Sequence, residues 1–100
     1  RLENYEVEAI CKAFKALFLD EDHLWLFGSR ANPNEKGGDI DLYIETQISD
    51  YQKIVDNRIQ LAIDIKSEIG EQKVDIVINP LRGEPLPIYE AARKQGVQLI

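Results

Sequence analysis

Residues 39–45 constrain the fold most strongly, because polar and aliphatic side chains alternate along Asp39-Ile40-Asp41-Leu42-Tyr43-Ile44-Glu45. A period of two predicts a β-strand with one apolar face. The opposite face then carries Asp39 and Asp41, two carboxylates about 6–7 Å apart along the strand. Carboxylates at this spacing repel each other unless something positive lies between them. The chain therefore needs a sheet that buries its aliphatic face against helices and offers its acidic face to a cation.

The segment before this strand predicts a helix and then a buried strand. Within residues 4–19, apolar side chains recur at the spacing of one helical face, at Val7, Ile10, Cys11, Phe14, Leu17 and Phe18. Cys11 falls on that face, and we expect it to be a small core residue. The apolar run 23–27 is typical of a buried strand and places Trp25 in the core. We expect a structural or solvent-facing role for His23, since no second histidine is present to share a metal.

A long helix is predicted over residues 49–69. Ser49 and Gln52 suit a capping box at its start, and Gly70 suits its end. Its predicted buried stripe consists of Tyr51, Ile54, Leu61, Ala62, Ile65 and Ile69. Arg58 interrupts this stripe, as either a rim residue with its charge in solvent or a side chain that reaches a bound nucleotide.

The rest of the chain predicts a strand at 73–78, a helix that ends at Gln95 before Gly96, and a short strand at 97–100. Pro87 is compatible with the first turn of that helix. The whole order is α, β, β, α, β, α, β. It predicts an α/β (α+β) fold, a small mixed β-sheet with helices packed on it, as one domain over residues 1–100.

The strand at 73–78 repeats the acidic pattern, with Lys73, Asp75 and Val77 on one face. If it pairs with the first acidic strand, Asp75 joins Asp39 and Asp41. Three converging carboxylates are costly unless neutralised, and all-oxygen ligands favour Mg²⁺, Mn²⁺ or Ca²⁺. Mg²⁺ accepts one or two protein carboxylates and completes its shell with water and substrate phosphate. The acids therefore predict a divalent-metal site that a phosphate-bearing ligand completes, and Lys73 is a candidate phosphate contact.

Gly28 and Ser29 follow the buried strand 23–27 and predict a phosphate site. Glycine lets the backbone approach a ligand closely, and backbone N–H groups with a hydroxyl in a tight turn hold phosphate oxygens. Arg30 adds a guanidinium fork for phosphate. A Gly-Ser pair alone is more often a plain turn, but Gly-Ser followed at this distance by Asp-x-Asp on the next strand is far more specific.

This combination resembles the nucleotidyltransferases of the DNA polymerase beta superfamily. Their pattern is Gly-Ser, about ten residues, Asp-x-Asp and a third acid on a later strand. The matching segments are Phe27-Gly28-Ser29-Arg30-Ala31, Asp39-Ile40-Asp41-Leu42 and Val74-Asp75-Ile76-Val77, with nine residues between Ser29 and Asp39. The small size is similar to that of the minimal nucleotidyltransferase group, whose members often pair with HEPN-domain proteins as toxin–antitoxin modules.

The resemblance implies a polymerase-beta-like nucleotidyltransferase fold and an ATP-dependent transferase. It implies that Asp39 and Asp41 hold two Mg²⁺ ions, for which Mn²⁺ is an alternative, and that Asp75 is a ligand or the base. Gly28 and Ser29, with Arg30, would bind the triphosphate. The implied reaction is transfer of AMP to a hydroxyl of a HEPN-domain partner, which silences the toxin.

Charge and composition limit the setting of this activity. The chain has 12 basic and 18 acidic residues and a net charge of -6, which argues against direct nucleic-acid binding and favours a protein acceptor. No apolar run approaches the roughly 20 residues that span a bilayer, so no membrane partner is expected. The single cysteine, Cys11, excludes an internal disulfide and fits the cytoplasm.

Two alternatives stay open. The domain could neutralise its partner by contact alone, without catalysis. It could also transfer a nucleotide to a small molecule such as an aminoglycoside, in which case a second subunit would have to supply the acceptor pocket.

Overall fold

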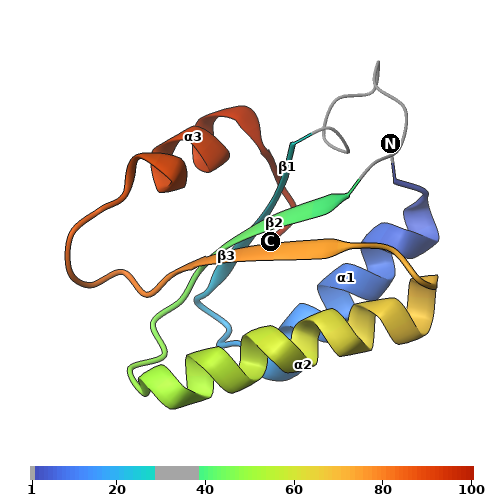
Figure 1. Ribbon diagram of the computed structural model, residues 1–100, viewed down its shortest axis with the longest axis horizontal. Coiled ribbons are helices and arrows are strands. Elements are labelled where there is room, and N and C mark those ends of the chain that lie inside the picture. Colours follow the sequence, from blue (N-terminus) through green and yellow to red (C-terminus); the bar gives the residue numbers. More distant parts are fainter. Residues whose placement is uncertain (1, 29–38) are drawn as a thin grey trace.

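Helices cover both faces of a central four-stranded sheet in the computed structural model, which describes residues 2–28 and 39–100 (Figure 1). The described residues form α1 (Asn4–Leu17), β1 (His23–Phe27), β2 (Ile40–Glu45), α2 (Tyr51–Ile69), β3 (Val74–Asn79), α3 (Pro87–Gln95) and β4 (Val97–Gln98). The predicted α+β class and the predicted order of elements are confirmed. Within the described ranges, no helix has the length and apolarity needed to cross a membrane.

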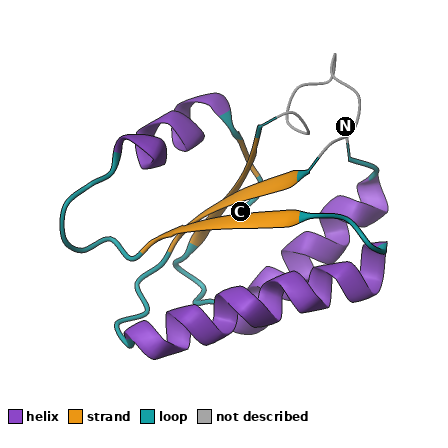
Figure 2. Cartoon of the chain, in the orientation of Figure 1, coloured by secondary structure: helices purple, strands orange, loops and turns teal. Residues whose placement is uncertain are grey.

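The sheet is mixed, with strand order β3-β2-β1-β4. β1 runs antiparallel to both β2 and β4, whereas β2 and β3 run parallel. Parallel neighbours need a long crossover connection, and α2 supplies it (Figure 2). β3 therefore lies at one edge of the sheet, next to the strand that carries Asp41.

The larger core lies between the sheet and the pair α1 and α2. Ile40, Leu42 and Ile44 of β2 are fully buried there. They pack with helix residues that include Ile10, Phe14, Leu61 and Ile65, and with the aliphatic residues Val74, Ile76 and Ile78 of β3. The predicted alternation of β2 and β3 is confirmed, because each strand directs its aliphatic set to this side.

A smaller cluster lies on the other face, under α3. Trp25, Tyr43 and Ala92 are buried there, and Val77 and Tyr89 pack against them. The Trp25 and Tyr43 rings are tilted, with centroids 5.2 Å apart. Trp25 is 4% exposed, so its predicted place in the core is confirmed.

Asp22 fixes the connection between α1 and β1. Its side chain is buried and accepts hydrogen bonds from Leu19 N at 2.9 Å, Thr46 Oγ1 at 2.6 Å and Gln47 N at 2.8 Å. α1 therefore ends at Leu17 and not at 19, because the chain turns to bring Leu19 N to this carboxylate. The two bonds from Thr46 and Gln47 hold the residues just after β2 beside this turn.

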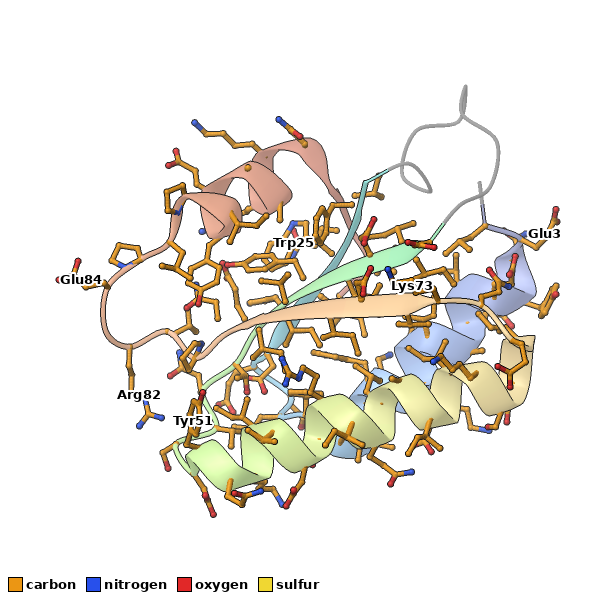
Figure 3. The ribbon with its side chains drawn as sticks, viewed as in Figure 1. Glu3, Trp25, Tyr51, Lys73, Arg82 and Glu84 are labelled. Carbon is orange, nitrogen blue, oxygen red and sulfur yellow. The ribbon has the colours of Figure 1, made fainter. Side chains whose placement is uncertain are left out.

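Two side-chain predictions for α2 are wrong. Asp50, not Ser49, caps the helix, because Asp50 Oδ1 accepts from Gln52 N and Lys53 N. Tyr51 is 71% exposed, since it begins the helix at the end of the molecule, where no neighbouring element covers it (Figure 3). Gly70 ends α2 as predicted, with a φ of 94°.

Cys11 is half-buried and is not among the core residues, because it lies at the flank of the stripe that buries Ile10 and Phe14. Burial raises the pKa of its thiol, and nearby Lys15 partly offsets this. His23 is exposed, with Nδ1 3.3 Å from the Ile100 carbonyl oxygen, in agreement with a structural role. β4 is shorter than predicted, although Leu99 N still donates to Leu24 O at 2.8 Å beyond its end.

Candidate active site

The parallel pairing of β2 and β3 brings the predicted acids to one face of the sheet. Asp41 lies opposite Asp75 in the register of the two strands. Tyr43, two residues beyond Asp41 and on the same face, belongs to the cluster under α3. The carboxylates therefore face away from α1 and α2, as the alternating pattern predicts. Asp39 directly precedes β2 and lies beside this pair through its contact with Lys73.

Lys73 is the positive group that lies between two of these acids. Its Nζ atom is 3.6 Å from Asp39 Oδ2 and 3.9 Å from Asp75 Oδ2. The Lys73 side chain is 67% exposed, and those of Asp39 and Asp75 are 49% and 50% exposed. Exposed ion pairs of this length contribute little free energy and exchange readily. A stronger cation could therefore displace Lys73 at small cost.

The surroundings of Asp41 disfavour its ionised carboxylate. Burial raises the pKa of its carboxyl above the ordinary value, and Asp75 and Asp39 raise it further. Lys73 offsets only part of this increase. A cation beside Asp41 would reverse the shift, because an opposite charge favours the ionised carboxylate. The negative charges around Asp41 therefore outweigh the single positive charge of Lys73.

Gly28 lies against the Asp41 carboxylate at the end of β1. Phe27 pairs with Asp41 across the strands, and Gly28 follows with a φ of 77°, in the left-handed region. A Cβ atom at this position would collide with Asp41 Oδ2. Only glycine combines this backbone conformation with this close approach. Gly28 thus leaves the backbone bare next to an acid, as the predicted phosphate turn requires.

The donor set fits a divalent cation in its chemistry, since Asp39, Asp41 and Asp75 offer only oxygen atoms on one face. In residues 2–28 and 39–100, however, no three acidic, histidine or cysteine side chains form a group that could hold a metal ion. In the structure, the carboxylates of Asp39 and Asp75 are paired with the Lys73 ammonium. Ser29 and Arg30, the other predicted nucleotide-binding residues, lie outside the described residues.

Arg58 is exposed on α2 and lines a groove of about 420 Å³ together with Ile59, Ile63, Val74, Asp75 and Ile76. The groove lies where α2 meets the edge strand β3, so Arg58 and Asp75 share a rim. This position is compatible with either of the two roles that the sequence leaves open.

A polar network beside the acids was not singled out from the sequence. Tyr43 OH donates to Glu45 Oε2 at 2.8 Å, and Asn79 Nδ2 donates to Tyr43 OH at 3.0 Å. Arg93 of α3 places Nη1 3.7 Å from Glu45 Oε2. Burial, together with Glu45, raises the pKa of Tyr43 to about 12 although Asn79 and Arg93 lower it, so the phenol stays protonated. The alternation of β2 places Glu45 on the acidic face, but its burial under α3 has no local sequence signal.

Comparison with known protein families identifies the family of the chain. The family model described as "Nucleotidyltransferase domain" matches residues 7–96. That range contains Gly28 and all three acids, and the mixed sheet with its helices agrees with the polymerase-beta-like nucleotidyltransferase fold. No curated protein matches the sequence. Because the family model covers nearly the whole chain, the protein belongs to the nucleotidyltransferase domain family, whose members are transferases of nucleotidyl groups.

Proposed function

We propose that this nucleotidyltransferase uses ATP and Mg²⁺ to transfer AMP to a hydroxyl of a partner protein, and that it acts in the cytoplasm as the antitoxin of a HEPN-domain toxin. The observation that carries the proposal is the pairing of Asp41 with Asp75 on one face, beside Gly28. The family membership supports the type of reaction. The resemblance to minimal nucleotidyltransferases supports the partner and the choice of ATP.

Asp39, Asp41 and Asp75 would hold Mg²⁺ or Mn²⁺ in this function. When bound, the metal supplies positive charge to the triphosphate and lowers the pKa of the attacking hydroxyl. The raised pKa of Asp41 supports this role, since its cause is burial beside two other acids. Lys73 would then be released from the acids and would contact a phosphate oxygen.

The transfer reaction itself would take place on the face of the sheet that carries the three acids. The acceptor oxygen attacks the α-phosphorus and forms a new P–O bond. The bond from the α-phosphorus to the bridging oxygen breaks, and pyrophosphate leaves with that electron pair. Asp75 takes the hydroxyl proton, since it is half exposed and lies at the edge of the sheet. Gly28 leaves room for the triphosphate next to Asp41, where any side chain would collide.

Charge supports a protein acceptor over a nucleic acid. The chain carries a net charge of -6 and presents three acids on the candidate face. A polyanionic acceptor would be repelled there at every step of its approach. A tyrosine or serine hydroxyl on a folded partner carries no such penalty.

The test is incubation with ATP labelled at the α-phosphate, Mg²⁺ and a co-encoded HEPN-domain protein. We expect the partner to gain label and the mass of one AMP group. Asp41→Asn and Asp75→Asn should abolish the gain, whereas Glu84→Gln, on the exposed loop between β3 and α3, should leave it unchanged. An unlabelled partner with both Mg²⁺ and Mn²⁺ would contradict the proposal.

Neutralisation by contact is the second candidate, and one observation favours it. Lys73 already bridges Asp39 and Asp75, so these two acids have a positive partner within the chain itself. The double variant Asp39→Asn, Asp41→Asn distinguishes the two functions. Neutralisation that survives in this variant, with a partner of unchanged mass, supports contact alone; loss of both supports catalysis.

A further inference from the structure

β3 forms one edge of the sheet, and no described strand pairs with its outer side (Figure 1). Lys73 O, directly before β3, accepts a hydrogen bond from Ile40 N of β2 at 2.9 Å. Because backbone groups alternate in direction along a strand, the N–H and C=O groups of Val74, Ile76 and Ile78 point away from β2. These outward groups form a template on which another strand can pair.

The aliphatic row of β3 is less covered than that of β2. Val74, Ile76 and Ile78 are half-buried, whereas the aliphatic residues of β2 are fully buried in the same core. No proline or charged residue interrupts this row, and Pro80 follows only after the strand has ended. Natural proteins usually protect an edge strand with such residues or cover it. Within the described part of the chain, the outer edge of β3 thus has the properties of a surface that another chain covers.

α2 presents apolar side chains next to this edge. Ile59 and Ile63 are 55% and 53% exposed. Together with Ala62 they line the helix side of the groove of about 420 Å³, and Val74 and Ile76 line its strand side. Residues at this spacing share one face of a helix, and large exposed apolar residues that gather on one face mark an interaction surface. The apolar face of α2 therefore extends the surface offered by β3.

The segment Lys73-Val74-Asp75 is complementary in charge to a second copy of itself. When two copies of β3 pair antiparallel about Val74, Lys73 of each copy lies directly opposite Asp75 of the other. Directly opposite residues share a face, with Cβ atoms about 4.5–5.5 Å apart, and opposite charges stabilise such pairs. Val74 has outward backbone groups, so each Val74 N–H can donate to the C=O of the other Val74.

The same charges disfavour the neighbouring registers. Pairing about Asp75 would place the two Asp75 carboxylates opposite each other, and like charges there are destabilising. Pairing about Ile76 would place Asp75 opposite Val77 and Lys73 opposite Asn79, so neither charge would face a counter-charge on the other strand. Charge complementarity therefore favours a second copy of this chain as the partner and selects one register.

We propose that two copies of the protein associate through antiparallel pairing of their β3 strands about Val74, with Lys73 of each copy opposite Asp75 of the other. The sheet then continues across a twofold axis that runs perpendicular to it. Both α2 helices lie on one face of this sheet, and both acidic faces lie on the other. Each acidic site thereby includes a lysine from a second chain. The association does not depend on the proposed transfer of AMP.

Sedimentation equilibrium of the whole chain, without nucleotide or metal, measures this association. The wild type should form a dimer at protein concentrations up to about 1 mM, a range that reveals even a millimolar dissociation constant. Hydrogen exchange should show a Val74 amide that is protected at high concentration and exchanges faster on dilution. A wild type that stays monomeric throughout this range, or a dimer without protection of Val74, would overturn the proposal.

Charge reversal tests the register. Lys73→Asp and Asp75→Lys each place like charges opposite each other on both sides of Val74, so either variant alone should be monomeric. An equimolar mixture should form a heterodimer, because every opposed pair then joins an acid with a lysine. The variants should associate with each other at least about 10-fold more tightly than either does with itself. A mixture that associates no more than its components would contradict the pairing, and circular dichroism shows that both variants are folded.

The controls are charge reversals outside the proposed interface. Lys53→Asp, at the start of α2, and Glu84→Lys, in the loop between β3 and α3, alter exposed residues and should leave the dimer unchanged. Ile63→Gln removes an exposed apolar side chain from the groove and should weaken the dimer at least about 3-fold. An unaltered dimer in Ile63→Gln would contradict the place of α2 in the interface.

These measurements are independent of the proposed function. A monomeric wild type could still label a partner with AMP, so that result would overturn the association alone. Conversely, a protein that pairs through β3 and labels no partner keeps the dimer and loses the proposed acceptor.

Discussion

Asp41 lies directly opposite Asp75 across the parallel pairing of β2 and β3. The two carboxylates share a face with Asp39, and Lys73 bridges Asp39 and Asp75 at 3.6 and 3.9 Å. The arrangement places like charges together at the end of a folded sheet, where it weakens the native state. Such local conflict is typical of functional sites. The clustered carboxylates should therefore affect stability and metal binding, and they should limit which residues fit at position 28.

Replacement of Asp41 by asparagine should stabilise the protein at neutral pH. The folded-state pKa of Asp41 is raised above 3.8, so the native state holds its proton more tightly than the unfolded state does. Stability therefore falls as the pH rises from about the unfolded value through the raised folded value. The melting temperature of Asp41→Asn should exceed that of the wild type at neutral pH, and the difference should vanish below the unfolded pKa. Glu84→Gln should show no such difference. If Asp41→Asn left the melting temperature at neutral pH unchanged, repulsion between Asp41 and the neighbouring acids would not weaken the fold.

Removal of Lys73 should strengthen metal binding in the absence of nucleotide. Its ammonium competes with a metal for Asp39 and Asp75, and an exposed pair of this kind is worth about 0.2–1 kcal/mol. Lys73→Gln should therefore bind Mn²⁺ up to about 5-fold more tightly, measured by calorimetry. Lys53→Gln, an exposed lysine at the start of α2, is the matched control. Weaker binding by Lys73→Gln would show that Lys73 does not compete for these acids.

Alanine at position 28 should disturb the acidic site more than alanine at position 83. The two glycines have nearly the same φ, 77° and 76°, so the backbone cost of about 1–2 kcal/mol is shared. Only at Gly28 does the new Cβ collide, with Asp41 Oδ2, whereas nothing lies within 4 Å at Gly83. Both variants should melt earlier than the wild type, and only Gly28→Ala should lose the rise in melting temperature that Mg²⁺ produces. If Mg²⁺ raised the melting temperature of both variants equally, Gly28 would not be part of the metal site.

Asn in place of Asp22 should destabilise the fold by about 1–3 kcal/mol, because an amide cannot accept all the hydrogen bonds that the buried carboxylate accepts. Urea unfolding at neutral pH measures the change. The neighbouring Asp20→Asn alters an exposed side chain and should stay within about 0.5 kcal/mol of the wild type. If Asp22→Asn lowers the free energy of unfolding no more than Asp20→Asn does, the hydrogen bonds of Asp22 do not stabilise the fold as argued.

The strands and their faces were predictable because their signal is local. The alternation in residues 39–45 and 73–78 assigns Ile40 and Ile76 to the core and Asp41 to the opposite face, and a period of two leaves no other choice. Gly70 and Gly96 mark helix ends for equally local reasons. The Gly-Ser and Asp-x-Asp spacing led to a nucleotidyltransferase, which the family match supports.

Other features depend on packing that no local pattern encodes. Ser49 and Asp50 are both good helix caps by residue type, so the local sequence does not distinguish them, and the structure uses Asp50. Tyr51 fits an apolar stripe in the sequence, yet the helix begins beyond the edge of the core. The polar network at Glu45 is covered because α3 crosses above Tyr43, and the position of α3 is set by contacts distant in the sequence. The roles of Asp39, Asp41 and Asp75 stay predictions.

The crossover through α2 has a consequence for when the acidic pair exists at all. Asp41 and Asp75 lie on parallel strands, and the connection between these strands contains the whole of α2. An emerging or truncated polypeptide without α2 in place holds one of these carboxylates and lacks its companion. If these two acids act together as proposed, the site is complete only in a chain that extends through β3.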